Sequence, residues 1–244
     1  MRQRFSRSKV LSLSDEYGNH EPSEVKALVV NFFETLLRQP ARCPRIDDDL
    51  MRRAIPKRIS GDQCATLGRE VSDDENKAVL FSLKDNKAPG PDGYNATLFK
   101  KAWSVVGDDV LHAIRSFFSS GRLLKQVNAT MIALIPKVPN PSKVGDFRPI
   151  SCCNTIYKCI AKIIANQVQM VLPDIGPFQS AFVADKRISD NILLSRELLR
   201  NYHRDGAHPR CALKVNLMKA YDSVRWDFLV AILQIVGFPE QMIA

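Results

Sequence analysis

Residues 130–152 read TMIALIPKVPNPSKVGDFRPISC, and this stretch decides how the middle of the chain folds. An apolar run at residues 130–135 and a plausible partner strand at residues 147–152 flank a segment that contains the sequence Pro-Asn-Pro. Apolar runs rich in β-branched and aromatic residues, separated by turn-forming residues, are typical of paired strands. The stretch therefore predicts a strand, a loop and a second strand.

Helices are predicted on both sides of this hairpin, because apolar residues recur there at helical spacing. The expected helices begin after Pro22-Ser23, at Ser72 (within a capping-box pattern), before Val110, at Ile156 and at Ser189, and the last one carries Phe228–Leu233. Prolines and glycines exclude a helix at residues 88–93. One more short strand is expected at residues 211–216. Helices dominate and the few strands come late, which is the pattern of the α+β fold class.

The composition is that of a globular protein rather than a disordered one, since 45% of the 244 residues are hydrophobic and 25% are charged. No apolar run is long enough to cross a membrane, and no signal-peptide stretch follows the basic N-terminus. The six cysteines form no CxxC pair, so neither a zinc site nor a disulfide framework is indicated. An intracellular location, nuclear or cytoplasmic, is the expectation from these features.

The acidic run Asp47–Asp49 allows two interpretations. Three carboxylates in a row could bind a metal ion, but consecutive side chains point in different directions. A solvated charge run or the first turn of a helix is therefore the favoured interpretation. The common signatures of serine hydrolases, zinc proteases and phosphate-binding loops are absent from the sequence.

The net charge of +9 and the isoelectric point near 9.3 favour a polyanionic partner such as nucleic acid. The alternative is that the lysines and arginines only solvate the helix surfaces. Charge alone does not decide between these two interpretations.

Seven sequence blocks that follow one another in a definite order favour the first interpretation, a nucleic-acid partner. The blocks are Lys87–Gly93 (KAPGPDG), Leu134–Lys137 (LIPK), Asp146–Ser151 (DFRPIS), Tyr157-Lys158 with Ala161–Ile163, Gln179–Phe182 (QSAF), Ile188–Ile192 (ISDNI) and Leu213–Val224 (LKVNLMKAYDSV). The series resembles the motifs of LINE-type (non-LTR) retrotransposon reverse transcriptases, in particular plant-like ones. The resemblance is strong over residues 72–244. Residues 1–71 resemble more weakly the segment that links the endonuclease to the polymerase in that family.

The resemblance implies an incomplete α+β architecture: the fingers subdomain of a right-hand polymerase, with the first strand and helix of its palm. Residues 1–71 would be a helical and irregular N-terminal extension, residues 72–210 the fingers, and residues 211–244 the truncated start of the palm. The rest of the palm, the thumb and the endonuclease would be missing from the chain.

The resemblance also implies which residues handle the nucleotide. Arg148 and Lys137 occupy the positions of cations that neutralise the triphosphate of the incoming nucleotide, and Tyr221 that of the aromatic residue screening the sugar 2′ position. The family's cofactor is Mg²⁺, held by aspartates as a pair of ions. Asn216 stands where the first of these aspartates is expected, and it brings no negative charge. No intact metal site is therefore expected in this chain.

The expected function is that of a truncated RNA-directed DNA polymerase, a nucleotidyltransferase that is inactive on its own. Asn216 replaces an aspartate, and the paired aspartates of the family's Tyr/Phe-Ala-Asp-Asp motif do not occur within the 244 residues. The implied partners are an RNA template, a DNA primer and a dNTP. Two alternatives stay open: a non-catalytic, basic nucleic-acid-binding remnant, and a relic without a stable product. Whether this chain is itself an enzyme is left undecided by the sequence.

Overall fold

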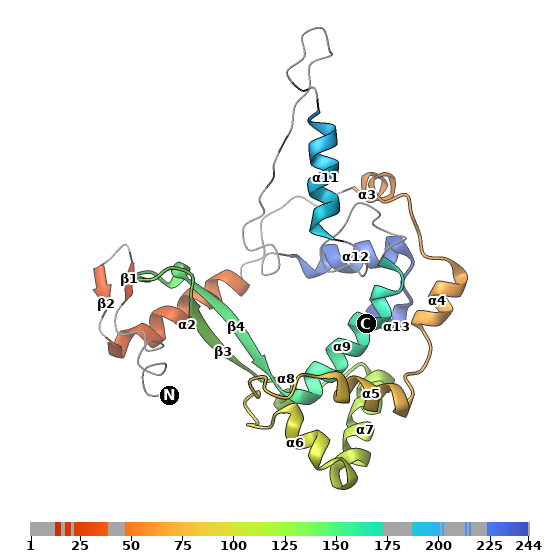
Figure 1. Cartoon of the computed structure of the whole chain (residues 1–244), viewed down its shortest axis with the longest axis horizontal. Helices are drawn as coiled ribbons and strands as arrows, with labels where there is room; N and C mark the ends of the chain where they lie inside the picture. The colour runs from red at the N-terminus through yellow and green to blue at the C-terminus, as the bar shows by residue number, and fades with distance from the viewer. Residues whose placement is uncertain are drawn as a thin grey trace. The chain divides into compact units, whose positions relative to one another are not determined.

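The computed structural model describes residues 13–15, 18–20, 22–38, 47–172, 187–200, 202, 213, 215 and 224–243 (Figure 1). Contacts divide the chain into two units, one formed by Met1–Arg42 with Glu70–Ile163 and the other by Cys43–Arg69 with Ile164–Ala244. Helices make up most of the described residues, and the described strands form two antiparallel pairs. The prediction of an α+β fold class is therefore confirmed.

The predicted hairpin of residues 130–152 is present. Strand β3 (Thr130–Pro136) pairs antiparallel with β4 (Phe147–Cys153), and Ile135 lies opposite Arg148. Because successive side chains of a strand point to opposite faces, Leu134 and Phe147 lie on the face opposite to that of Arg148.

That face packs on α2 (Pro22–Arg38), the predicted first helix, which lies beside one end of the hairpin (Figure 1). The core between them contains Val25, Phe33, Val144 and Phe147. A short pair of strands, β1 (Leu13–Asp15) and β2 (Gly18–His20), precedes α2 and was not predicted.

The first unit is completed by helices on either side of the hairpin in sequence. They are α5 (Asp73–Ser82), α6 (Ala96–Lys101), α7 (Trp103–Ser120), α8 (Lys125–Asn128) and α9 (Thr155–Gln169), the last of which continues into the second unit. Their apolar faces are buried at the predicted positions, with Leu80, Ile114 and Ile163 fully inaccessible.

Ser72 accepts a hydrogen bond from the Glu75 N–H at 3.2 Å, which confirms the predicted N-cap of α5. Gly121 ends α7 in the left-handed conformation, as its position predicted.

In the second unit, α3 (Asp48–Ala54) and α4 (Gly61–Leu67) accompany α12 (Trp226–Val236) and α13 (Glu240–Ile243). Their core contains Leu67, Val171, Val236 and Phe238. Asp47 caps α3 by accepting a hydrogen bond from the Asp49 N–H at 3.0 Å, so the acidic run is the first turn of a helix rather than a metal site. Each described helix is too short or too polar to span a lipid bilayer.

The predicted start of α11 (Ile188–Leu198) was wrong by two positions. The N-cap is Arg187, whereas Ser189 lies inside the first turn. The physical reason is Asp190, whose carboxylate accepts the Arg187 N–H at 3.1 Å and so stabilises the earlier start. The strand expected at residues 211–216 lies outside the described residues, apart from Leu213 and Val215, which belong to no strand.

A buried asparagine in α5 gives a test of the helical packing. Asn76 is 1% exposed, and neither its Oδ1 nor its Nδ2 has a hydrogen-bond partner among the described residues. Burying an unpaired amide costs free energy, so Asn76→Ala should raise the free energy of unfolding by about 1 kcal/mol. The measurement is urea unfolding followed by Trp103 fluorescence, in a Trp226→Phe background that leaves one tryptophan. Asn86→Ala, on the exposed loop after α5, is the control. A loss of stability in Asn76→Ala beyond that of the control would contradict this interpretation.

Candidate nucleotide and nucleic-acid interface

Two exposed cations lie at one end of the β3–β4 hairpin. Lys137 directly follows β3, and its backbone N–H donates to the Asp146 carbonyl at 2.7 Å. Its Nζ donates to the Gly145 carbonyl at 2.8 Å. Arg148 is the second residue of β4, and Pro136 pairs with Phe147 between the two cations. The hairpin register therefore brings together two residues that the sequence separates by the whole loop.

The loop that joins the strands is held in shape by Asp146. Its carboxylate accepts the backbone N–H groups of Lys143 and Ser142, both at 3.0 Å. These two hydrogen bonds lower the pKa of Asp146 below its ordinary value, because they stabilise the charged form. The nearby ammonium groups of Lys143 and Lys137 lower this pKa further by electrostatic attraction, although the carboxylate hydrogen-bonds to the backbone rather than to either side chain. Within the described part of the chain, neither Lys137 nor Arg148 forms an ion pair with a carboxylate.

The strand face that carries Arg148 is apolar and open. Ile150 lies two residues further along β4, and Ile135 and Met131 lie on the same face of β3. Each of these three apolar side chains is about half exposed. An exposed apolar face beside a guanidinium group that has no ion pair among the described residues can contact both the rings and the phosphates of a nucleotide.

The KAPGPDG loop is fastened to the start of α9 through Asn154. This asparagine is 4% exposed, and its Nδ2 donates to the carbonyls of Gln126 at 2.9 Å and Val127 at 3.2 Å. Its Oδ1 accepts the backbone N–H of Asp92 at 3.3 Å. Gly90 lies so close that a Cβ added there would come within 2.6 Å of the Cys153 carbonyl carbon, and closer still to Asn154.

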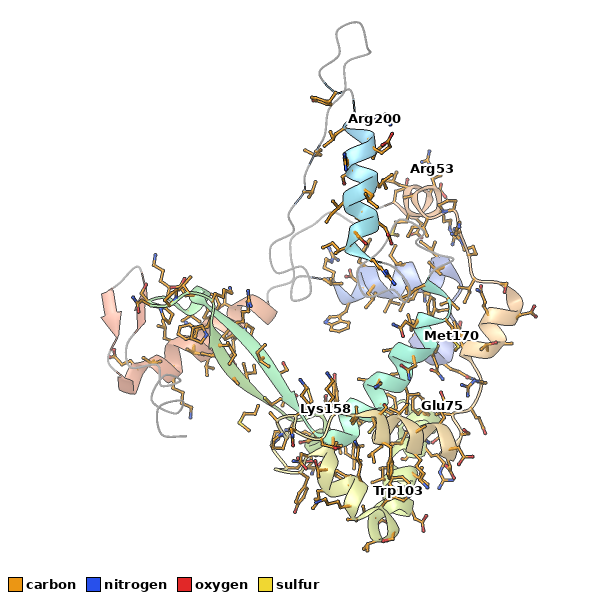
Figure 2. The ribbon with its side chains drawn as sticks, viewed as in Figure 1. Arg53, Glu75, Trp103, Lys158, Met170 and Arg200 are labelled. Atoms are coloured by element: carbon orange, nitrogen blue, oxygen red, sulfur yellow. The ribbon has the colours of Figure 1, made fainter. Side chains whose placement is uncertain are left out.

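Two further hydrogen bonds join the loop region to α9. The Thr155 hydroxyl donates to the Tyr94 carbonyl at 2.9 Å, and Lys158 Nζ donates to the Ala88 carbonyl at 2.7 Å. Figure 2 shows Lys158 where β4 leads into α9. The sequence predicted only a tight turn at residues 88–93. The adjacent polar pair Asn154-Thr155, between a strand and a helix, was the available signal for its attachment.

The other two site residues implied by the resemblance, Asn216 and Tyr221, lie outside the described residues. Over the described ranges, no three His, Cys, Asp or Glu side chains gather into a group that could hold a metal ion. The described site therefore consists of cations, an apolar strand face and a fastened loop.

Comparison with known proteins gives a consistent assignment. Residues 135–244 match the family described as reverse transcriptase (RNA-dependent DNA polymerase). The chain is 27% identical to the Transposon TX1 uncharacterized 149 kDa protein of Xenopus laevis, over 98% of this chain and 18% of that protein. It is 22% identical to the Pol polyprotein of retrotransposable element R2DM of Drosophila melanogaster, over 98% of this chain and 22% of that protein. It is also 22% identical to the putative 115 kDa protein of element R1DM of the same fly, over 68% of this chain and 16% of that protein.

The relationship to non-LTR retrotransposon reverse transcriptases, indicated by the motifs, is therefore confirmed. Lys137, Arg148, Asn216 and Tyr221 all fall within the region that matches the reverse transcriptase family. The chain spans no more than 22% of the length of the curated relatives described above. The narrower likeness to plant elements stays a prediction.

Proposed function

We propose that this chain is the fingers region and the beginning of the palm of an RNA-directed DNA polymerase of a non-LTR retrotransposon. In this proposal residues 72–210 form the fingers, residues 211–244 begin the palm, and residues 1–71 are an N-terminal extension. An RNA template, a DNA primer and a dNTP are the partners, and the protein works in the nucleus or the cytoplasm. The observation that carries the proposal is the position of Lys137 and Arg148 at the same end of the hairpin, with neither cation in an ion pair among the described residues.

The proposed role of these two cations is to hold the triphosphate of the incoming dNTP. A guanidinium group binds phosphate oxygens through paired N–H donors, and an ammonium group adds a point charge. The Asp146 hydrogen bonds keep the loop before Arg148 in one shape, which limits the entropy lost when the triphosphate binds. Tyr221 is proposed to face the sugar, and Asn216 to stand in the place of a metal-binding aspartate. Divalent metal ions serve reverse transcriptases generally, and the described residues include no group of three His, Cys, Asp or Glu side chains that could hold one.

A second candidate function is nucleic-acid binding without catalysis. The observation that favours it is Asn216, whose amide lacks the negative charge of an aspartate. The two candidates differ in a primer-extension assay on an RNA template with Mg²⁺, where only a polymerase lengthens the primer. Both candidates predict that the basic surface binds nucleic acid.

The test of the proposed nucleotide site is the affinity for a dNTP. Arg148→Ala and Lys137→Ala should each weaken dNTP binding about 10- to 150-fold, because each removes a charge-assisted contact worth about 1.5–3 kcal/mol. Isothermal titration calorimetry with dTTP, and with thymidine as the ligand without phosphates, provides the measurement. Arg122→Ala removes an exposed arginine between α7 and α8 and serves as the matched control. If the affinities for dTTP of all three variants equal that of the parent chain, the proposed nucleotide site is wrong.

A further inference from the structure

A cavity of about 230 Å³ lies between the KAPGPDG loop, β4 and the start of α9. It belongs entirely to the first unit and lies beside the fastened loop described above. Its lining includes Leu83, Lys84, Lys87, Ala96, Ile150 and Lys158. Sites for drug-sized ligands begin near ~300 Å³, so this cavity fits a small group such as one nucleobase.

The cavity combines an apolar wall with basic residues. The wall comes from Leu83, Ala96 and Ile150, and no carboxylate contributes to the lining. Lys84 and Lys87 are exposed, and within the described ranges they make neither an ion pair nor a side-chain hydrogen bond. These two ammonium groups are thus available to an anionic ligand. The third lysine, Lys158, is engaged with the Ala88 carbonyl.

The walls of the cavity are firmly held. Asn154 and Lys158 tie the loop to α9, and the Thr155 hydroxyl is engaged with the Tyr94 carbonyl. A cavity whose walls are already in place loses little conformational entropy when a ligand enters. On its remaining side lies β4, which among the described residues has β3 as its only neighbouring strand. Its other edge therefore presents backbone groups that can hydrogen-bond to a base.

We infer that this cavity binds one unstacked nucleotide of a single-stranded polynucleotide, with the base against the apolar wall and the adjacent phosphates at Lys84 and Lys87. A free phosphate would leave the apolar wall unused, and an apolar small molecule would leave the two ammonium groups unused. A base within a duplex is paired and stacked, so it would have to be flipped out before it could enter. The cavity thus selects single strands.

The inference rests on the proposed function, because it adds a strand-binding position beside the dNTP site. The two positions share one face of β4: Arg148 belongs to the proposed dNTP site, and Ile150, two residues further along, lines the cavity. A single strand that enters the cavity would thus pass next to the position proposed for the triphosphate.

The test compares single-stranded and duplex binding by fluorescence anisotropy with the full chain. The probes are a short fluorescein-labelled RNA, a DNA of the same sequence, and a hairpin duplex. Lys84→Gln/Lys87→Gln should weaken binding of the single strands about tenfold. It should also reduce the slope of log K against log salt by about 1.4, since each lost phosphate contact accounts for ~0.7. If the affinities for RNA and for DNA fall to a similar extent, the site recognises the base and the phosphates, which both strands share. If only the affinity for RNA falls, the site recognises RNA, as expected of a site for the template strand.

Two controls separate the cavity from general electrostatics. Lys101→Gln/Lys125→Gln removes two exposed lysines of the same unit that do not line the cavity, and it should weaken binding no more than about twofold. Ala88 also lines the cavity, and Ala88→Leu narrows it without changing charge, so this variant should weaken single-strand binding while duplex binding stays the same.

The inference would be overturned if Lys84→Gln/Lys87→Gln weakened single-strand binding no more than Lys101→Gln/Lys125→Gln does. It would also be overturned if Lys84→Gln/Lys87→Gln weakened duplex and single-strand binding equally. A parent chain that binds no single strand in low salt would overturn it as well. The dTTP titration is independent of all these outcomes, because Arg148 and Lys137 are unchanged in every cavity variant. If the cavity variants leave single-strand binding unchanged while dTTP still binds, the inference about the cavity is wrong and the proposed function is unaffected.

Discussion

Gly90→Ala is expected to lower the free energy of unfolding of the first unit by about 3 kcal/mol or more. A Cβ at position 90 would come within 3.0 Å of the Asn154 side chain, the Asn154 backbone nitrogen and the Cys153 carbonyl carbon. Two of these atoms belong to the backbone at the junction of β4 and α9, so no side-chain rotation relieves the overlap. Urea unfolding followed by Trp103 fluorescence, in the Trp226→Phe background, measures the loss.

Two further variants sharpen this prediction. Gly145→Ala is the matched control, because an added Cβ there meets no atom within 4 Å and the backbone is not in the left-handed region. It should leave the stability within about 0.5 kcal/mol of the parent chain. Combining Gly90→Ala with Asn154→Gly removes the side-chain overlap but keeps the backbone ones, so it should not restore stability. A Gly90→Ala variant as stable as Gly145→Ala would show that the loop does not pack against α9 in this way.

Asn154→Ala is the second change with a large expected effect, about 2–4 kcal/mol of stability. The substitution leaves two carbonyls, those of Gln126 and Val127, without the donor that the nearly buried Asn154 side chain supplies, and the Asp92 N–H without its acceptor. Asn154→Asp should be at least as destabilising near neutral pH. It keeps the acceptor but loses both donated hydrogen bonds, and it directs a carboxylate at two carbonyl oxygens.

The local consequence distinguishes this prediction from a general loss of stability. Hydrogen exchange of the amides in residues 90–94 should speed up in Asn154→Ala before the helix α7 is affected, because the loop loses its attachment. Asn128→Ala, an exposed asparagine at the end of α8, is the control and should change neither measurement. Unchanged exchange in the loop of the Asn154→Ala variant would mean that Lys158 and Thr155 suffice to hold it.

Local sequence patterns determined the elements that carry the candidate site. The hairpin followed from an apolar run and a plausible partner strand around a proline-containing loop. The register of this hairpin then places Lys137 and Arg148 at the same end. Helix α7 and its end at Gly121 followed from apolar spacing and the conformational freedom of glycine. The family relationship was likewise readable from the ordered motifs, and the comparisons confirm it. These features depend on near neighbours in the chain, whose spacing is visible in the sequence.

Other features were visible only in the tertiary structure. Helix α4 was not predicted, and α3 was foreseen only as one interpretation of the acidic run at its start. Leu67, the buried residue of α4, becomes part of a core only through its packing with Val236 and Phe238. The start of α11 depended on whether Asp190 or Ser189 would satisfy the first turn, and both are good capping residues.

The KAPGPDG loop shows most clearly which features local sequence specifies and which only tertiary contacts specify. By itself the motif specified a turn, since its prolines and glycines exclude regular structure. Its attachment to Asn154 joins residues that are 62 positions apart, and the lysine-lined cavity beside it exists only once that contact forms. Such contacts depend on burial and shape between distant segments, which propensity and spacing do not encode. The sequence alone thus determined which residues form the hairpin and the turn, and tertiary packing decided that they build one surface.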